Sequence, residues 1–132
     1  MRNMSFFHTQ QQILDQTKTV TRRLGWKFLQ SGDIVQPVVK GQGLKKGEKV
    51  KQLGCPIRII TVRREWLSHV RRPWEMYKEG FPKISSEEFM EMFRKINNLK
   101  EDVLITRIEF EYTEPKHITP AWRGRSKSWV QE

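Results

Sequence analysis

The stretch VLITRIEFEY, residues 103–112, predicts a β-strand with one buried face. Leu, Thr, Ile, Phe and Tyr occupy its even positions, whereas Arg107, Glu109 and Glu111 stand at odd positions. Because successive side chains of a strand point to opposite faces, we expect the even positions to lie against a core and the charged ones to lie opposite. Pro115 follows closely and marks the expected end of the packed domain.

Three other segments of the chain predict strands. Residues 17–23 are rich in β-branched side chains and predict a strand or an extended loop, and residues 57–63 predict a second strand. Residues 34–39 predict a third strand. Pro37 places that strand at an edge of the sheet or at a bulge, because proline has no N–H to donate to a neighbour.

The expected helices are short. Residues 9–15 and 73–79 each predict one or two turns, and Pro73 stands at a first helical position, where proline is well tolerated. Ser85 and Glu88 have the spacing of a capping box and precede an apolar stripe, which predicts a third, longer helix.

Strands and short helices of this kind predict an α+β domain. The helices between strands are too few and too short for a parallel α/β sheet, so we expect a small barrel-like sheet. A chain of 132 residues fits one domain. We place this domain at residues 1–115, including a loop over 40–54, and treat residues 116–132 as a basic C-terminal tail.

The composition favours a polyanionic ligand. The chain has 25 Lys and Arg against 15 Asp and Glu, a formal charge of +10, and such a field attracts nucleic acid. Five Trp, seven Phe and two Tyr argue against disorder. The single Cys excludes an internal disulfide, and the three His lie far apart, so we expect neither a metal site nor a cofactor.

Membrane and export signals are absent from the sequence. No apolar run reaches the ~18 residues of a membrane helix, and the N-terminus lacks the apolar region of a secretory signal. We therefore expect a cytoplasmic protein without a membrane partner.

Two basic segments can contact phosphates. The loop over 40–54 contains four Gly and five Lys, among them Lys45 and Lys46, and is either a solvated linker or a phosphate-contacting arm. The tail interleaves aromatic and basic side chains, namely Trp122, Arg123 and Arg125. Tryptophans in this context either stack on bases or dock onto the domain.

The segment KTVTRR, residues 18–23, is the densest basic stretch next to a predicted strand. It is either an ordinary basic strand with solvated cations or an anion-binding strip. In the second case Lys and Arg contact phosphates, and threonine hydroxyls contact a base or a sugar.

An ordered set of motifs over roughly residues 6–113 resembles the ASCH domain family. The set comprises FFHT at 6–9, IL at 13–14, KTVTRR at 18–23, GDIV at 32–35, the strand at 57–62 followed by RRE at 63–65, YKEGF at 77–81, the helix after Ser85, and the closing strand through Phe110. The chain departs from many relatives by having Asp15-Gln16-Thr17 where they carry a glycine, and by adding the basic loop and tail.

The resemblance implies a PUA-like fold, which is a small, mostly antiparallel β-barrel with short helices around a cleft for RNA or a nucleotide-like ligand. One bacterial branch hydrolyses the acetyl amide of N(4)-acetylcytidine, and its catalytic positions correspond here to Lys18, Thr21 and Glu79. Lysine would act as base or nucleophile, threonine as nucleophile or oxyanion donor, and glutamate as proton shuttle or lysine anchor. Some other relatives cleave single-stranded RNA.

We therefore expect nucleic-acid binding, with RNA favoured over DNA, by a cleft that accepts a base or a nucleotide. The alternatives are an amidohydrolase acting on N(4)-acetylcytidine and a single-stranded RNA nuclease. The expected nucleic-acid contacts are Lys18, Arg22, Arg23, Lys45, Lys46, Arg63, Arg64, Trp122, Arg123 and Arg125.

Overall fold

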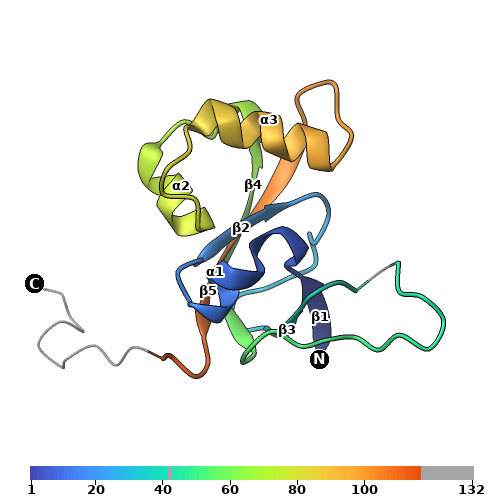
Figure 1. The fold of residues 1–132 in the computed structure, drawn as a ribbon. Coiled ribbons are helices and arrows are strands. Elements are labelled where there is room, and N and C mark those ends of the chain that lie inside the picture. Colours follow the sequence, from blue (N-terminus) through green and yellow to red (C-terminus); the bar gives the residue numbers. More distant parts are fainter. Residues whose placement is uncertain (42, 117–132) are drawn as a thin grey trace, which may run out of the picture.

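A computed structural model describes residues 1–41 and 43–116. Five strands form one sheet in the order β1-β3-β4-β5-β2, with short helices beside it (Figure 1). The strands are β1 (Arg2–Ser5), β2 (Val20–Arg23), β3 (Ile34–Val38), β4 (Ile57–Trp66) and β5 (Leu104–Tyr112). The helices are α1 (Gln10–Leu14), α2 (Pro73–Glu79) and α3 (Ser86–Ile96), with 3-10 turns at Phe7–Thr9 and Leu67–His69.

The sheet is mixed and open. β1 pairs with β3 in parallel, and the pairs β3–β4, β4–β5 and β5–β2 are antiparallel. The strand order ends at β1 and β2 without joining them, so the expected closed barrel is not confirmed. The α+β class is confirmed.

Local signals fix the ends of α2 and α3 as expected. α2 begins at Pro73 and ends at Glu79, and the next residue, Gly80, has a φ of 93° in the left-handed region that glycine adopts readily. α3 begins with a complete capping box, because Ser85 Oγ accepts from the Glu88 N–H at 3.1 Å and the Glu88 carboxylate accepts from the Ser85 N–H at 2.8 Å.

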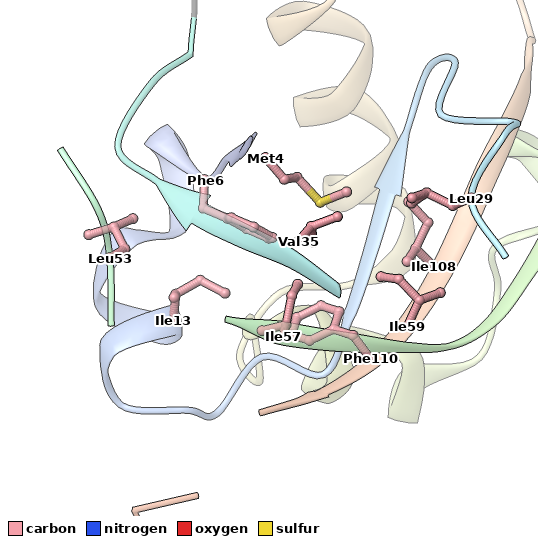
Figure 2. Packing of buried hydrophobic residues seen from close by; sticks show 10 residues of the cluster. All are labelled: Met4, Phe6, Ile13, Leu29, Val35, Leu53, Ile57, Ile59, Ile108 and Phe110. Atoms are coloured by element: carbon pink, nitrogen blue, oxygen red, sulfur yellow. The ribbon is translucent and has the colours of Figure 1, made fainter. Parts of the chain in front are cut away.

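The larger apolar core lies against one face of the sheet. Phe6 and Phe110 pack edge to face there, with ring centroids 6.1 Å apart. Figure 2 shows the cluster, which consists of Met4, Phe6, Ile13, Leu29, Val35, Leu53, Ile57, Ile59, Ile108 and Phe110. This core joins α1, β1, β3 and β4 to β5.

The second core joins β5 to helices α2 and α3. Its buried members are Leu67, Val70, Met76, Phe89, Met90, Phe93 and Ile105. The simple alternation of buried even and exposed odd positions expected for β5 is therefore wrong. Leu104 is 40% exposed, whereas Ile105 and Arg107 are buried. The second core and α2 cover the face that carries these odd positions, and sequence periodicity gives no information about that cover.

Pro37 lies in an inner strand rather than at an edge or a bulge. β3 pairs with β1 along its last four residues but with β4 only through Ile34 and Val35. Beyond that point the Pro37 carbonyl accepts from the Leu53 N–H at 2.9 Å. The end of the basic loop thus replaces β4 as the neighbour of β3 at Pro37.

The basic loop leaves and returns along β3 and projects away from the helices (Figure 1). At its base the Val39 N–H donates to the Lys51 carbonyl at 2.8 Å, and Val38 forms an isolated bridge with Gln52. Within the described residues, no helix is both long and apolar enough to cross a membrane.

Candidate ligand-binding cavity and its ion-pair network

A cavity of about 490 Å³, here called cavity 1, opens beside the two edge strands β1 and β2. Its lining comes from four parts of the chain, which are the end of β1 with the segment after it, β2 with the residues on either side, the end of α2 with Phe81, and α3 with Asn97. The lining residues are Ser5, Phe6, Phe7, His8, Thr9, Lys18, Thr21, Arg22, Arg23, Leu24, Trp26, Glu79, Phe81, Phe89, Met92, Phe93, Ile96 and Asn97. The three catalytic positions implied by the resemblance therefore meet in one cavity.

Lys18 and Glu79 form a buried ion pair in cavity 1. Lys18 Nζ donates to Glu79 Oε1 at 2.7 Å and to the Glu79 main-chain carbonyl at 2.8 Å. That carbonyl is available because α2 ends at this residue, and the last carbonyls of a helix lack partners within it. Burial lowers the pKa of Lys18 below its ordinary value, and the Glu79 carboxylate opposes that change.

Arg22 holds three carboxylates together. Its Nε donates to Glu65 at 2.8 Å, one terminal nitrogen donates to Glu79 at 3.0 Å, and the other donates to Glu75. Burial alone would lower the pKa of Arg22, but the three carboxylates raise it above its ordinary value. Each nitrogen of this guanidinium is therefore engaged, and Arg22 fixes the position of Glu79.

Glu75 connects this network to β5. It lies one helical turn before Glu79 on the same face of α2, which packs against β2. Arg107 Nε donates to Glu75 Oε1 at 2.8 Å, so two buried guanidinium groups share this carboxylate. Although burial would raise the pKa of Glu75, Arg107 and Arg22 lower it to about 2.

Thr21 and Arg23 form the other polar part of cavity 1. Arg23 Nε donates to Thr21 Oγ1 at 3.2 Å, and a terminal nitrogen of Arg23 donates to the Ser5 carbonyl. The guanidinium also lies over the Phe6 ring, 4.5 Å from its centroid. Burial lowers the pKa of Arg23 to about 10, with Glu79 opposing. Among residues 1–41 and 43–116, Arg23 makes no ion pair.

Apolar and aromatic side chains also line cavity 1. Phe81, Phe89 and Phe93 come from α3 and the segment before it, and their adjacent rings lie 6.4 and 6.2 Å apart. Phe89 and Phe93 belong to the second core as well. Trp26 contributes from the segment after β2 with a φ of 55°, which is uncommon for an aromatic residue. Strained backbone of this kind is often found at ligand sites.

The other expected contacts lie elsewhere. Lys45 and Lys46 are exposed in the projecting loop and line none of the four cavities described, whereas Arg63 lines a second cavity beyond Arg22. Arg64 Nε donates to the Ile105 carbonyl at 3.2 Å. Trp122, Arg123 and Arg125 lie outside the described residues.

Sequence reasoning missed Glu65, Glu75 and Arg107. The spacing of Glu75 and Glu79 at i and i+4 was the available signal, because it places two carboxylates on one face of a short helix. No signal pointed to Arg107, which stands at an odd position of β5 and was expected opposite the core. Over the part of the chain that the structure describes, no three His, Cys, Asp or Glu side chains gather as a metal site.

Two solved structures have the same fold as this chain. A crystal structure of an ASCH domain from Lactobacillus crispatus JV V101 superposes with a TM-score of 0.59 and 19% identity, covering 84% of this chain and 78% of that one. A protein from Enterococcus faecalis V583, of the family DUF984, superposes with a TM-score of 0.61 and 15% identity, covering 85% and 76%. No protein-family model and no curated protein matches the sequence.

The chain therefore has the fold of an ASCH domain. The resemblance in the motifs is confirmed at the level of the fold, over most of the chain.

Proposed function

We propose that this chain binds nucleic acid, RNA in preference to DNA, by taking one base or nucleotide into cavity 1. The observation that carries the proposal is the combination of aromatic side chains in the lining of cavity 1 with Arg23, a half-buried cation that makes no ion pair within the described residues. Aromatic rings suit the flat face of a base, and a guanidinium without a carboxylate partner suits a phosphate or a base edge. The preference for RNA rests on the resemblance to ASCH domains.

The three cations of cavity 1 have different roles in this proposal. Lys18 and Arg22 already have carboxylate partners, so they shape the floor of the cavity and hold Glu79 in place. Arg23 is the direct contact to the ligand. Lys45, Lys46 and the tail residues remain proposed contacts to phosphates outside the cavity.

The test is the affinity of the full chain for a fluorescein-labelled 12-nucleotide uridine RNA, measured by fluorescence anisotropy. We expect Arg23→Ala to weaken binding about tenfold or more, in the range typical of losing a charge-assisted contact. Arg58→Ala is the matched control. Arg58 is exposed, pairs with Glu111 of β5 and does not line cavity 1. Equal affinities of the two variants would refute the role of cavity 1.

A second function is favoured by the Lys18–Glu79 pair, which lines the same cavity as Thr21. We propose as the alternative that cavity 1 removes the acetyl group from N(4)-acetylcytidine. Thr21 Oγ1 accepts from Arg23, which leaves its own hydrogen available to a base. Lys18 can accept a proton when it is neutral, and its burial favours the neutral form.

The chemistry of this alternative balances with water alone. Neutral Lys18 takes the hydroxyl proton as the Thr21 oxygen attacks the acetyl carbonyl carbon, and the bond from that carbon to N4 then breaks. Lys18 returns the proton to N4, releasing cytidine. Water then hydrolyses the acetyl ester on Thr21 and releases acetate, while Glu79 keeps Lys18 in position.

Chromatography of N(4)-acetylcytidine incubated with the protein tests this alternative. Turnover by the unchanged protein that disappears in both Lys18→Ala and Thr21→Val would support hydrolysis. Absence of turnover at high protein concentration, together with RNA binding that depends on Arg23, would leave binding as the function of the cavity.

A further inference from the structure

A second cavity, here called cavity 2, lies on the other side of the buried network. Its volume is about 550 Å³, and Arg22 is the only residue of its lining that it shares with cavity 1. It is formed by Arg22 of β2, by β4, by the segment before α2, by α2 itself and by β5. The lining residues are Arg22, Thr61, Arg63, Glu65, His69, Val70, Arg71, Arg72, Trp74, Glu75, Lys78, Arg107 and Glu109.

The charges of cavity 2 leave a positive rim. Its lining holds six cations and three carboxylates. The carboxylates of Glu65 and Glu75 pair with Arg22 and Arg107, and Glu109 accepts a hydrogen bond from Thr61 at 3.2 Å. Within residues 1–41 and 43–116, Arg71 and Arg72 make no ion pair.

The remaining rim cations are only loosely paired. Arg63 and Lys78 approach carboxylates at 3.7 and 3.5 Å, longer than a close ion pair, and their side chains are 60% and 40% exposed. Exposed pairs of this geometry contribute little, so these cations are available to an anion.

An aromatic platform stands among these cations. Trp74 is 52% exposed although its ring is large and apolar. The Arg72 guanidinium lies 5.4 Å from the centre of that ring. An exposed tryptophan beside one arginine, in a cavity that further arginines line, matches the alternation of flat base and charged phosphate along a single strand.

We infer that cavity 2 is a second nucleic-acid site, which binds the sugar–phosphate backbone of a single strand and stacks one base on Trp74. Arg71 and Arg72 are the principal phosphate contacts. An acidic peptide would use the same cations but would leave the tryptophan ring exposed, so the ring favours nucleic acid. The inference takes the class of ligand from the proposed function but concerns residues that cavity 1 does not contain.

The first experiment measures binding of the same labelled 12-nucleotide uridine RNA at several salt concentrations. For Arg71→Ala/Arg72→Ala we expect a slope of log affinity against log salt that is shallower by about 1.4, or ~0.7 for each lost phosphate contact to a single strand. Lys95→Ala/Lys100→Ala is the matched control, because it removes the same charge from exposed positions that line neither cavity 1 nor cavity 2. Equal slopes in the two double variants would overturn the inference.

The second experiment concerns Trp74. Trp74→Ala should weaken binding at least about fivefold, the lower end of the contribution of one stacked base, and Trp74→Phe should restore most of the affinity. Thermal unfolding of both variants checks that each is folded, which the exposure of the side chain favours. A loss that is the same for Ala and Phe would count against stacking.

Titration with uridine 5′-monophosphate separates this inference from the proposed function. Arg23→Ala should weaken binding of the mononucleotide, whereas the cavity 2 variants should bind it as the unchanged protein does. If only the Arg23 variant loses RNA affinity, the inference about cavity 2 fails; if only the cavity 2 variants lose it, the proposal for cavity 1 fails. Displacement of the RNA by a poly-glutamate peptide as readily as by unlabelled RNA would overturn nucleic acid as the ligand of cavity 2.

Discussion

The guanidinium of Arg23 donates to the main-chain carbonyl of Ser5, and this contact joins the two edge strands of an open sheet. Arg23 ends β2 and Ser5 ends β1, so the edges come within reach of one side chain at this end. Both residues also line cavity 1. Cavity 1 thus lies where the two edges of the open sheet approach each other.

Loss of Arg22 should strongly destabilise the protein. Arg22→Met leaves three buried or partly buried carboxylates without their shared partner, and breaking a buried ion pair from one side costs about 3–5 kcal/mol. Arg58→Met, which breaks an exposed pair with Glu111, should cost less than about 1 kcal/mol. Urea unfolding of both variants measures the difference, and similar midpoints would show that the network contributes little.

Acid should weaken the fold through Glu75. Its pKa in the folded protein is about 2, below the ordinary value of 4.5, so the folded state favours the ionised form. The resulting stabilisation is complete above pH 4.5 and disappears as the pH falls toward 2. The free energy of unfolding of Glu75→Gln should therefore change less between about pH 5 and pH 3 than that of the unchanged protein. Identical pH dependence in both would contradict the assignment.

Gly80 should be intolerant of a side chain. It has a φ of 93°, and a Cβ at this position would lie 2.8 Å from Gln12 Cγ and 3.5 Å from Lys18 Cβ. Gly80→Ala should therefore lower the unfolding temperature and also disturb the position of Lys18. Gly54→Ala is the control, since Gly54 has a φ of 61° but a Cβ added there would meet no atom of a non-adjacent residue within 4 Å. A smaller loss for Gly80→Ala than for Gly54→Ala would contradict the close contact.

The rate of acetylcytidine hydrolysis, where it occurs, should rise with pH through the pKa of Lys18. Burial lowers that pKa, and only the neutral amine can accept a proton from Thr21. Glu79→Gln removes the charge that opposes this shift, so its rate profile should move to lower pH, and a steady-state pH series measures both. A profile that moves to higher pH in Glu79→Gln would exclude lysine as the base.

The ends of α2 and the start of α3 were predicted well because local interactions determine them. Pro73 and Gly80 bound α2, and the capping box of Ser85 and Glu88 begins α3, because each signal acts over a few residues. β1 was not predicted, since Arg2–Ser5 shows neither β-branched residues nor alternation and becomes a strand only because β3 provides a partner.

The buried network required tertiary information. Lys18, Thr21 and Glu79 were expected together through the resemblance, and the structure brings them into one cavity. The burial of Arg107 depends on α2 and the second core covering that face of β5, which no pattern within residues 103–112 reports.

β5 also governs how the chain folds. Ile105 belongs to one apolar core, whereas Ile108 and Phe110 belong to the other, so neither core is complete before this last strand is in place. Its neighbours β2 and β4 lie far back in the chain, and long loops must close before either pairing forms. We therefore expect both cores to form in one late, cooperative step, more slowly than in a helical bundle of similar size.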